Sequence, residues 1–340
     1  MSTEVAQRTL NWVLSAYDLR QPLRITPVEA STRNDNFLVH TADKARFVLR
    51  RNRRVADEAR LRFQLRFQQH LLDSRFPTSR IVTSASGDTL VTDKDGGLWA
   101  LFTYIEGAEY DFSRVAQVEE AARRLAQFHS ITDSFPDDEV VCEANRWGAA
   151  WVVDSEVELA ALERMFRGRG VDDDLAFVRQ WATSVKSQVL AHLDVIPAGW
   201  VHGDYHGRNM VFVNDDIRGV FDFDPVSRGW RIEDVAYSLF MFGRESRLSR
   251  RIRDGVAHSF LAQYRKYRHV SAQEMQMLPI IGVAIWTTNA SYCEVIERDG
   301  EDAVAYFRRH TGLMRDVGAS FQPGSQYTAI LAQDNTAALD

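Results

Sequence analysis

Residues 200–224 read WVHGDYHGRNMVFVNDDIRGVFDFD, and this stretch decides the fold. It contains His202-Gly-Asp204, then Asn209 five residues after the aspartate, and Asp222-Phe-Asp224 after a short alternating segment. In phosphoryl transfer an aspartate orients or deprotonates the attacking hydroxyl, while an asparagine and a second aspartate hold Mg²⁺ against the triphosphate. Mg²⁺ prefers oxygen ligands and keeps several waters, so one amide and one carboxylate suffice beside bound phosphates. The pattern therefore predicts phosphoryl-transfer chemistry.

Asn209 and Asp222 flank a segment with the pattern of a β-hairpin. Residues 210–213 and 217–221 alternate around the polar turn 214–216, and such arms pair. A paired hairpin would bring Asn209 and Asp222 toward the same end, with Asp204 in the preceding loop facing the same site. A metal hydrolase loop is the alternative, because His and Asp at alternate positions can converge on one ion. The sequence offers no further His and Asp cluster to complete that ligand set, which favours phosphoryl transfer.

The order and spacing of these motifs resemble the aminoglycoside phosphotransferase and type II homoserine kinase superfamily. The superfamily pattern is His-Gly-Asp, four residues, Asn, an Asp-Phe-Asp-like segment and a later Asp-(Leu/Val)-Ala, which occurs here as Asp234-Val-Ala236. Residues 125–129, LAQFH, also resemble a helix-ending segment of these kinases. The resemblance implies an α+β, protein-kinase-like fold of two lobes, with a small β-rich N-terminal lobe and a larger, mainly helical C-terminal lobe.

The resemblance also implies roles for the motif residues. Asp204 resembles the catalytic base, and Asn209 and Asp222 resemble the Mg²⁺ ligands. Asp234 is expected ahead of a helix, as a buried carboxylate that steadies the loop. The supporting residues are therefore His202, Asp224 and Asp234. ATP and Mg²⁺ are the expected cofactors, and the γ-phosphate is expected to go to a hydroxyl of a small molecule.

The nucleotide side departs from the usual pattern, because the chain has no Gly-x-Gly-x-x-Gly loop. The small and polar residues 31–34, STRN, end in Asn34 and resemble the loop that opens this lobe in the homoserine kinase branch. Arg50 stands where the third strand of the fold carries a phosphate-binding Lys. Gln64 stands at the position of its usual helical Glu partner, and Glu58 is the only acid in the helix body, so the partner of Arg50 stays open.

Hydrophobic periodicity predicts strands first and helices afterwards. The N-terminal part is expected to contain a helix at 3–18, a hairpin with arms 36–40 and 46–50, a helix at 55–73, and strands at 88–92 and 98–105. The remainder is expected to contain the β-like insert at 210–224 and helices at 114–130, 155–166, 171–194, 246–267, 272–298 and 301–316.

This change of character near 105–107 predicts a nucleotide-binding lobe at 1–105, a catalytic and substrate-binding lobe at 106–321, and a mobile tail at 322–340. Thr103 and Ile105 lie at the end of the strand that runs into the joint, where backbone groups would bind adenine. An ordinary connection between lobes is the alternative for each of these side chains.

The acceptor is expected among the late helices, where aromatic, amide and acidic side chains follow an apolar run. These candidates are Trp286, Asn289, Tyr292 and Glu294. Such residues suit a cationic acceptor, through ion pairs and cation–π contacts. The classes considered are an amino alcohol, an amino sugar, an aminoglycoside and a homoserine-like compound. A solvated helix end is the alternative, because charges commonly cover exposed faces.

The composition of the chain limits the classes of partner that it is expected to bind. The 340 residues are 45% hydrophobic with a net charge of −6, which argues against a nucleic-acid partner. The sequence lacks a signal-peptide pattern and any uninterrupted apolar run of roughly 18 residues, and its two cysteines have no metal-ligand spacing. These features predict a cytoplasmic protein with no membrane partner, and they leave the oligomeric state open.

Two rival functions share the same fold. A protein kinase needs a long activation segment, but only nine residues separate Asp224 from Asp234. A catalytically silent nucleotide-binding scaffold would explain the departures at Arg50 and Gln64, yet it would not explain why Asp204, Asn209 and Asp222 are all present.

Overall fold

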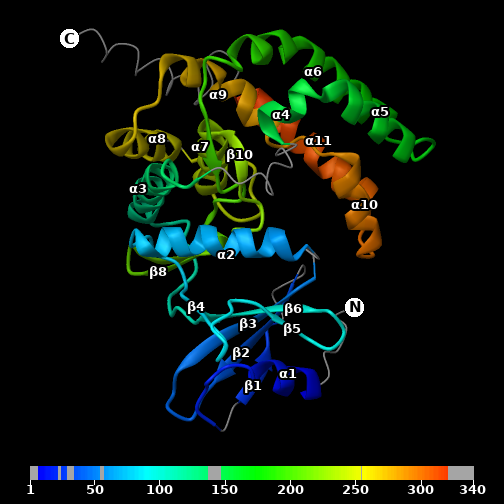
Figure 1. Ribbon diagram of the computed structural model, residues 1–340. Helices are drawn as coiled ribbons and strands as arrows, with labels where there is room; N and C mark the ends of the chain where they lie inside the picture. Colours follow the sequence, from blue (N-terminus) through cyan, green and yellow to red (C-terminus); the bar gives the residue numbers. More distant parts are fainter. Residues whose placement is uncertain are drawn as a thin grey trace. The chain divides into compact units, whose positions relative to one another are not determined.

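The computed structural model describes residues 7–21, 24–28, 34–53, 57–136, 147–253 and 255–320 (Figure 1). These residues form two compact units. The first falls within Met1–Glu109, Phe135–Val141 and Met210–Asp224, and the second within Tyr110–Ser134, Cys142–Asn209 and Pro225–Asp340. The tail predicted at 322–340 lies outside the described residues. The lobe limits at 105 and 106 stay a prediction.

The first unit is built on an antiparallel sheet with the strand order β1-β2-β3-β6-β4, and β5 also pairs with β6. Its elements are α1 (Gln7–Leu14), β1 (Arg24–Pro27), β2 (Asp35–His40), β3 (Arg46–Asn52), α2 (Glu58–Asp73), β4 (Ile81–Val82), β5 (Val91–Thr92) and β6 (Leu98–Thr103). In the register of β2 and β3, Asn36 lies opposite Arg50 and His40 lies opposite Arg46, which confirms the predicted hairpin.

The two faces of this sheet pack against different helices, because successive side chains of a strand point to opposite faces. Trp99 and Leu101 of β6 lie in a buried cluster with three side chains of α1, namely Leu10, Val13 and Leu14. Leu98 and Ala100 of the same strand lie in a second cluster with two side chains of α2, namely Leu61 and Leu65. The sheet is therefore buried on both faces, which fixes β3 and its Arg50 between its neighbours.

A separate hairpin in the first unit confirms the predicted β-insert. It consists of β8 (Met210–Val213) and β9 (Asp216–Val220), with Met210 opposite Val220 and a register shift after Val211. Its turn contains Asn214 at φ 56°, a left-handed conformation that asparagine tolerates better than most residues. Asn209 precedes the first paired residue of this hairpin in the chain, and Asp222 follows the last by two residues.

The second unit is mainly helical. Its helices are α3 (Val115–Thr132), α4 (Gly148–Val153), α5 (Ser155–Met165), α6 (Asp172–His192), α7 (Arg231–Gly243), α8 (Val256–Tyr267), α9 (Ala272–Ala284), α10 (Ala290–Arg298) and α11 (Ala303–Ser320). A short antiparallel pair, β7 (Ala198–Val201) with β10 (Ser227–Trp230), was not predicted. Strand β7 ends directly before His202 and β10 ends directly before α7, so this pair connects the His-Gly-Asp loop to the helix that carries Asp234.

Two predicted helices were wrong in extent. The helix expected at 246–267 begins only at Val256, after Gly255 at φ 74°, and Arg244 forms an isolated β-bridge with Ile252 instead. Leu248, an apolar position of the predicted pattern, is 92% exposed and therefore has no core to bury. The helix expected at 272–298 is interrupted at 285–289, because the Asn289 side chain accepts the backbone N–H of Tyr292 and caps a new helix.

Among the described residues, no helix is both long enough and apolar enough to cross a bilayer.

Candidate active site

Asp234 anchors the loop 202–209, which carries the His-Gly-Asp motif. Its carboxylate accepts the backbone N–H of His202 at 2.7 Å and that of Gly203 at 2.9 Å. It also bonds Nε2 of His129, the last residue of the LAQFH segment, at 3.1 Å. Asp234 is 1% exposed. It lies in the first turn of α7 and not ahead of the helix as predicted, so a rigid element positions the loop.

Two glycines let the loop 202–209 pass close to its neighbours. Gly203 has φ 77°, and a Cβ there would lie 3.0 Å from the Pro225 carbonyl oxygen. A Cβ on Gly207 would lie 2.5 Å from Cβ of Tyr110. The Gly207 contact is closer than a side chain allows, and the positive φ of Gly203 strains any other residue, so the motif needs glycine for conformation at Gly203 and for space at Gly207.

Three side chains of the second unit surround the carboxylate of Asp204. The Tyr237 hydroxyl donates to Oδ1 at 2.7 Å, and Nε2 of His206 lies 3.2 Å from the same atom. The amide nitrogen of Asn209 donates to Oδ2 at 3.1 Å and to the Asp204 carbonyl oxygen at 2.9 Å. Nδ1 of His206 accepts the N–H of Arg208 at 3.0 Å, so the His206 proton is on Nε2 and points to the carboxylate.

This environment keeps Asp204 ionised. Burial works to raise its pKa, but the hydrogen bonds from His206 and Tyr237 outweigh burial, and the pKa of Asp204 lies well below its usual range. An ionised carboxylate can accept the proton of a hydroxyl group. Asp204 therefore has the protonation state that a base requires.

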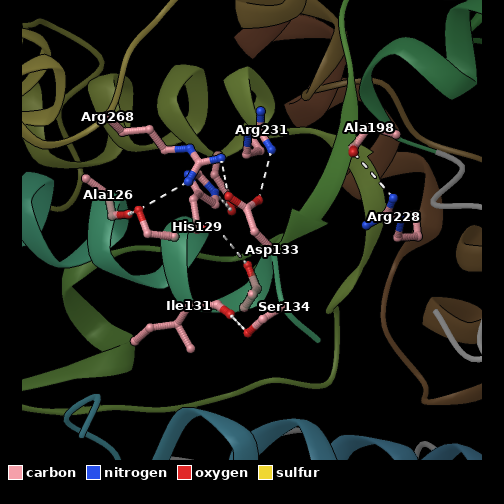
Figure 2. A network of polar contacts seen from close by, with 12 residues as sticks. Ala126, His129, Ile131, Asp133, Ser134, Ala198, Arg228, Arg231 and Arg268 are labelled. Carbon is pink, nitrogen blue, oxygen red and sulfur yellow. Dashed lines mark hydrogen bonds and ion pairs between the residues drawn. The ribbon is translucent and has the colours of Figure 1, made fainter. Parts of the chain in front are cut away.

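His129 belongs to a polar network at the end of α3 (Figure 2). Its Nδ1 lies 2.7 Å from the Tyr264 hydroxyl, opposite the bond to Asp234. Burial lowers the pKa of His129, although the Asp234 charge works in the other direction. Figure 2 shows Asp133, just after α3, bonded to Arg231 at 3.2 Å and to Arg268 at 2.7 Å. These ion pairs tie α3 to α7 and to the segment after α8.

Arg50 finds its acidic partner in the segment after the β8–β9 hairpin. One terminal nitrogen of its guanidinium lies 2.5 Å from Oδ2 of Asp224 and 3.7 Å from Oδ1 of Asp222. Asp222 has φ 65°, in the left-handed region. The Asn34 side chain also donates to Oδ2 of Asp224, at 3.1 Å. Arg50, Asn34, Asp222 and Asp224 thus form one cluster within the first unit.

Neither sequence candidate pairs with Arg50. Gln64 donates its side-chain N–H to the backbone oxygen of Asp224 at 3.2 Å, and Glu58 binds Arg62 at 2.8 Å. The helix position that usually carries Glu therefore supports the Asp224 segment through a neutral amide. The sequence pattern missed Asp224 as the partner because the two residues are 174 positions apart.

The remaining nucleotide candidates lie around the end of β6. The Thr103 hydroxyl accepts the N–H of Arg80 at 3.0 Å. Ile105 follows the strand, and its Cδ1 would lie 3.0 Å from a Cβ placed on Gly219 of the hairpin. Ser31 and Thr32 of the proposed phosphate loop lie outside the described residues. Adenine binding at Thr103 and Ile105 stays a prediction.

The four acceptor candidates do not gather at one point. Trp286 packs its ring 5.5 Å from Tyr237, the residue that donates to Asp204. Asn289 caps α10 and Tyr292 packs against Trp147, while the Glu294 side chain is exposed. Of the four, Trp286 has the direct connection to the Asp204 environment.

Comparison with known proteins places this geometry in a family. A model of the phosphotransferase enzyme family (APH) matches residues 24–271, which include the Asp204 loop and the Arg50 strand. The chain belongs to the phosphotransferase enzyme family.

Curated relatives of this phosphotransferase cover nearly its whole length. It is 25% identical over 342 residues to a homoserine kinase from Rhizobium etli, with 95% of this chain and 98% of the relative aligned. It is 27% identical over 330 residues to a homoserine kinase from Mesorhizobium japonicum, with coverages of 92% and 96%.

Solved structures share the fold of the phosphotransferase. An amicoumacin kinase in complex with AMP-PNP, Ca²⁺ and amicoumacin matches with a TM-score of 0.70 at 15% identity, covering 96% of this chain and 97% of that one. An aminoglycoside phosphotransferase from Alicyclobacillus acidocaldarius matches with a TM-score of 0.65 at 18% identity, with coverages of 98% and 99%. The fold is therefore protein-kinase-like, as predicted, and the chain is an enzyme of the small-molecule kinase class, with an alcohol group as acceptor.

Sequence reasoning missed two residues that contact Asp204 in the phosphotransferase, Tyr237 and His206. Tyr237 is three residues after Asp234 on α7, and residues at this spacing share a helix face. An expected helix carrying Asp234 could therefore have indicated Tyr237. His206 had no such signal, because loop residues follow no period.

Glu233 of the phosphotransferase is a buried carboxyl group next to Asp234. Its Oε1 accepts the N–H of Ala149 at 3.0 Å, and a Cβ on Gly148 would lie 2.5 Å from that oxygen. Burial raises the pKa of Glu233 to about 8, and the charge of Asp234 adds to the rise. Because the folded pKa exceeds the unfolded one, Glu233 contributes stability at low pH that is lost as the pH rises toward 8.

We expect the free energy of unfolding to fall by on the order of 3 kcal/mol from pH 5 to pH 8 because of Glu233. Glu233→Gln keeps an acceptor for Ala149 and removes the titration, so this part of the decline should disappear and the variant should exceed the wild type at pH 8. Urea unfolding at both pH values measures the difference, and the exposed Glu294→Gln serves as a control. Parallel declines in wild type and Glu233→Gln would show that Glu233 does not titrate in this range.

Proposed function

We propose that this phosphotransferase uses ATP and Mg²⁺ to transfer the γ-phosphate to a hydroxyl of a small molecule, with Asp204 as the base. The observation that carries the proposal is the Asp204 carboxylate, held ionised by His206 and Tyr237 on a loop that Asp234 anchors. Phosphoryl transfer needs little covalent chemistry from the protein, so a positioned acceptor for the hydroxyl proton and charge stabilisation suffice.

The residues present fit a magnesium ion. The amide nitrogen of Asn209 donates to Asp204, which leaves its amide oxygen Oδ1 as a hard ligand, and Asp222 supplies a carboxylate. Among the described residues, no three His, Cys, Asp or Glu side chains cluster as a metal cage. Mg²⁺ in kinases takes few protein ligands and shares phosphate oxygens and water, so two ligands suit it. When bound, the metal would neutralise phosphate charge. The pairing of Asn209 with Asp222 rests on motif spacing.

The Arg50 cluster supports a phosphate-binding role in the first unit. Nε of Arg50 is buried and has no hydrogen-bond partner among the described residues. A guanidinium can bind phosphate through charge-assisted hydrogen bonds, and both ion pairs of Arg50 use one terminal nitrogen, so its Nε and its other terminal nitrogen take no part in them. We assign the α/β-phosphates to Arg50, supported by Asn34 and Asp224, and the adenine to backbone groups near Thr103 and Ile105.

The acceptor class proposed is an amino alcohol, amino sugar, aminoglycoside or homoserine-like compound. The curated relatives are named homoserine kinases, and one structural neighbour is an aminopropanol kinase with a TM-score of 0.59. A protein acceptor is disfavoured, because the nine residues between Asp224 and Asp234 contain β10, which pairs with β7, and so leave little chain for an activation segment.

Arg50→Ala is expected to raise the apparent KM for ATP and lower kcat by about 10- to 100-fold, the effect of losing one or two charge-assisted hydrogen bonds. Arg53 lies three residues after Arg50 in the chain and pairs with Asp35 at 3.3 Å. Arg53→Ala should therefore have little effect and serves as the matched control. Steady-state kinetics over a range of ATP concentrations measures both variants.

Arg50→Lys is the sharper variant, because it keeps the charge and removes the planar fork. Recovery of most of the lost activity would indicate that a point charge suffices, as in kinases with Lys on this strand. Kinetics for Arg50→Ala that match the wild type would assign the phosphates to another residue.

An acceptor screen tests the proposed function. The protein is incubated with ATP and Mg²⁺ and with amino alcohols, amino sugars, aminoglycosides, L-homoserine or a protein mixture, and phosphorylated products are identified by mass spectrometry. We expect a phosphorylated small molecule. Phosphorylated protein alone would indicate a protein kinase, and ATP binding without any product would indicate a silent scaffold.

A further inference from the structure

Several buried polar atoms of the second unit have no hydrogen-bond partner among the described residues, and two of the donors lie beside one aromatic ring, that of Phe240. They are Nε of Arg244, the residue directly after α7, and Nε1 of Trp286, just after α9. Trp286 is 7% exposed. Leaving a buried donor unpaired costs about 1–3 kcal/mol, so proteins rarely keep two without a use.

Both donors belong to one aromatic cluster. Cζ of Arg244 lies 5.4 Å from the ring of Phe240, and the Trp286 ring lies 5.0 Å from the same ring. Tyr237 and Phe240 are three residues apart on α7 and share a helix face, and Arg244 directly follows the last helical residue, Gly243.

The same cluster extends to the proposed base. Tyr237 packs 5.5 Å from Trp286 and donates its hydroxyl to Asp204. The two unpaired donors are therefore connected to Asp204 through a single tyrosine. A group that binds them would belong to the molecule whose hydroxyl meets Asp204.

The positive charge of Arg244 indicates what kind of chemical group these donors would bind. One terminal nitrogen of Arg244 donates to the carbonyl oxygen of Arg247 at 3.0 Å, and no carboxylate of the described residues pairs with the guanidinium. The neighbouring Arg253 differs, because its terminal nitrogens are occupied by the Phe112 and Phe242 carbonyl oxygens and the Tyr110 hydroxyl. Nε of Arg253 also has no partner among the described residues, but both of its terminal nitrogens bond protein oxygens, whereas Arg244 has one such bond and retains donors for an anion.

We propose that Arg244 and Trp286 bind a carboxylate of the acceptor. This inference rests on the proposed function and narrows its acceptor class to hydroxy acids, including hydroxy amino acids. A planar carboxylate accepts from the edge of one guanidinium and from an indole N–H. An ammonium group offers no acceptor for either donor and is repelled by Arg244, so Trp286 serves as a donor rather than as a cation–π surface.

Matched pairs of compounds test this assignment, since each pair differs only in a carboxylate. They are L-homoserine with 3-amino-1-propanol, L-serine with ethanolamine, and L-threonine with 1-amino-2-propanol. Calorimetry with AMP-PNP and Mg²⁺ measures their binding. We expect the acid of at least one pair to bind the wild type about 10- to 100-fold more tightly than its amino alcohol.

Variants then locate the carboxylate. Arg244→Gln should weaken binding of that acid by about 10- to 100-fold and leave the amino alcohol unchanged, and Trp286→Phe should weaken the acid by a smaller factor while keeping the ring packing. Arg247→Gln, an exposed neighbour, is the control and should change neither. Equal binding of acids and amino alcohols, no binding of any acid, or an unchanged acid affinity in Arg244→Gln would overturn the assignment.

Turnover separates this inference from the proposed function. If an acid binds through Arg244 but is never phosphorylated, the proposed function fails and the carboxylate site stands. If carboxylate-free acceptors are phosphorylated at full rate by Arg244→Gln and acids are not preferred, the carboxylate site fails and the proposed function stands.

Discussion

Asp204→Asn is expected to lower kcat by about 10²- to 10⁴-fold, the range that a positioned base contributes, while ATP still binds. The asparagine has nearly the same shape and keeps an oxygen for Tyr237 and His206. It loses the negative charge that accepts the hydroxyl proton. In the wild type the amide nitrogen of Asn209 donates to Oδ2 of Asp204 at 3.1 Å. In the variant this nitrogen would face the side-chain nitrogen of the new asparagine, which is also a donor, so the Asn209 side chain must rotate or lose that bond.

Kinetics and nucleotide titration on the same preparation check this prediction. Asp216→Asn is the matched control, because Asp216 is exposed on the β8–β9 hairpin. It should keep wild-type turnover. A variant at Asp204 that turns over at the wild-type rate would remove this residue from the base role, and a variant that loses ATP binding as well would point to a structural role.

Asp222→Ala is expected to weaken Mg²⁺-dependent ATP binding and to lower turnover by on the order of 10²-fold or more, because one of two protein ligands is removed. The substitution has a second cost. Asp222 has φ 65°, a conformation that strains alanine, and its carboxylate lies 3.7 Å from Arg50. Asp222→Asn is therefore the cleaner variant, because asparagine tolerates this backbone and keeps an oxygen ligand without the charge.

Calorimetric titration of ATP with Mg²⁺ and with EDTA measures the effect. The wild type should bind more tightly with Mg²⁺, Asp222→Asn should lose part of this difference, and Asp222→Ala should lose most of it. Equal wild-type affinity under both conditions would contradict a metal site at Asp222.

Local patterns predicted much of the fold. The hairpin of β2 and β3 and the insert of β8 and β9 follow from alternation around polar turns. The first holds residue by residue, whereas in the second the strand β9 covers Asp216–Val220 instead of 217–221 and the register shifts after Val211. The helix over Glu58–Asp73 follows from apolar spacing, although it begins three residues later than expected. These elements bury the side chains that produced the pattern, which is why sequence periodicity reveals them.

Elements whose bounds depend on tertiary contacts were harder to predict from the sequence. Leu248 fits a helical pattern but lies in solvent, so the helix begins at Val256. Asn289 ends one pattern by capping a new helix. The partner of Arg50 is Asp224, and no local rule relates residues so far apart in the chain.

The residues of the candidate site also divide into those that the local sequence predicts and those that only tertiary contacts reveal. The spacing of Asp204, Asn209 and Asp222 was readable because the motif is continuous. The contacts of Tyr237 and His206 with Asp204, and the unpaired donors of Arg244 and Trp286, depend on how helices and loop pack.

Phosphorus NMR of a reaction with ATP, Mg²⁺ and the small-molecule acceptors of the screen tests the central claim most directly. We expect a new phosphate-ester resonance that grows together with ADP, one ester for each ADP, and that is absent with Asp204→Asn. ADP accompanied only by inorganic phosphate, or no consumption of ATP with any acceptor, would contradict phosphoryl transfer to a small-molecule hydroxyl.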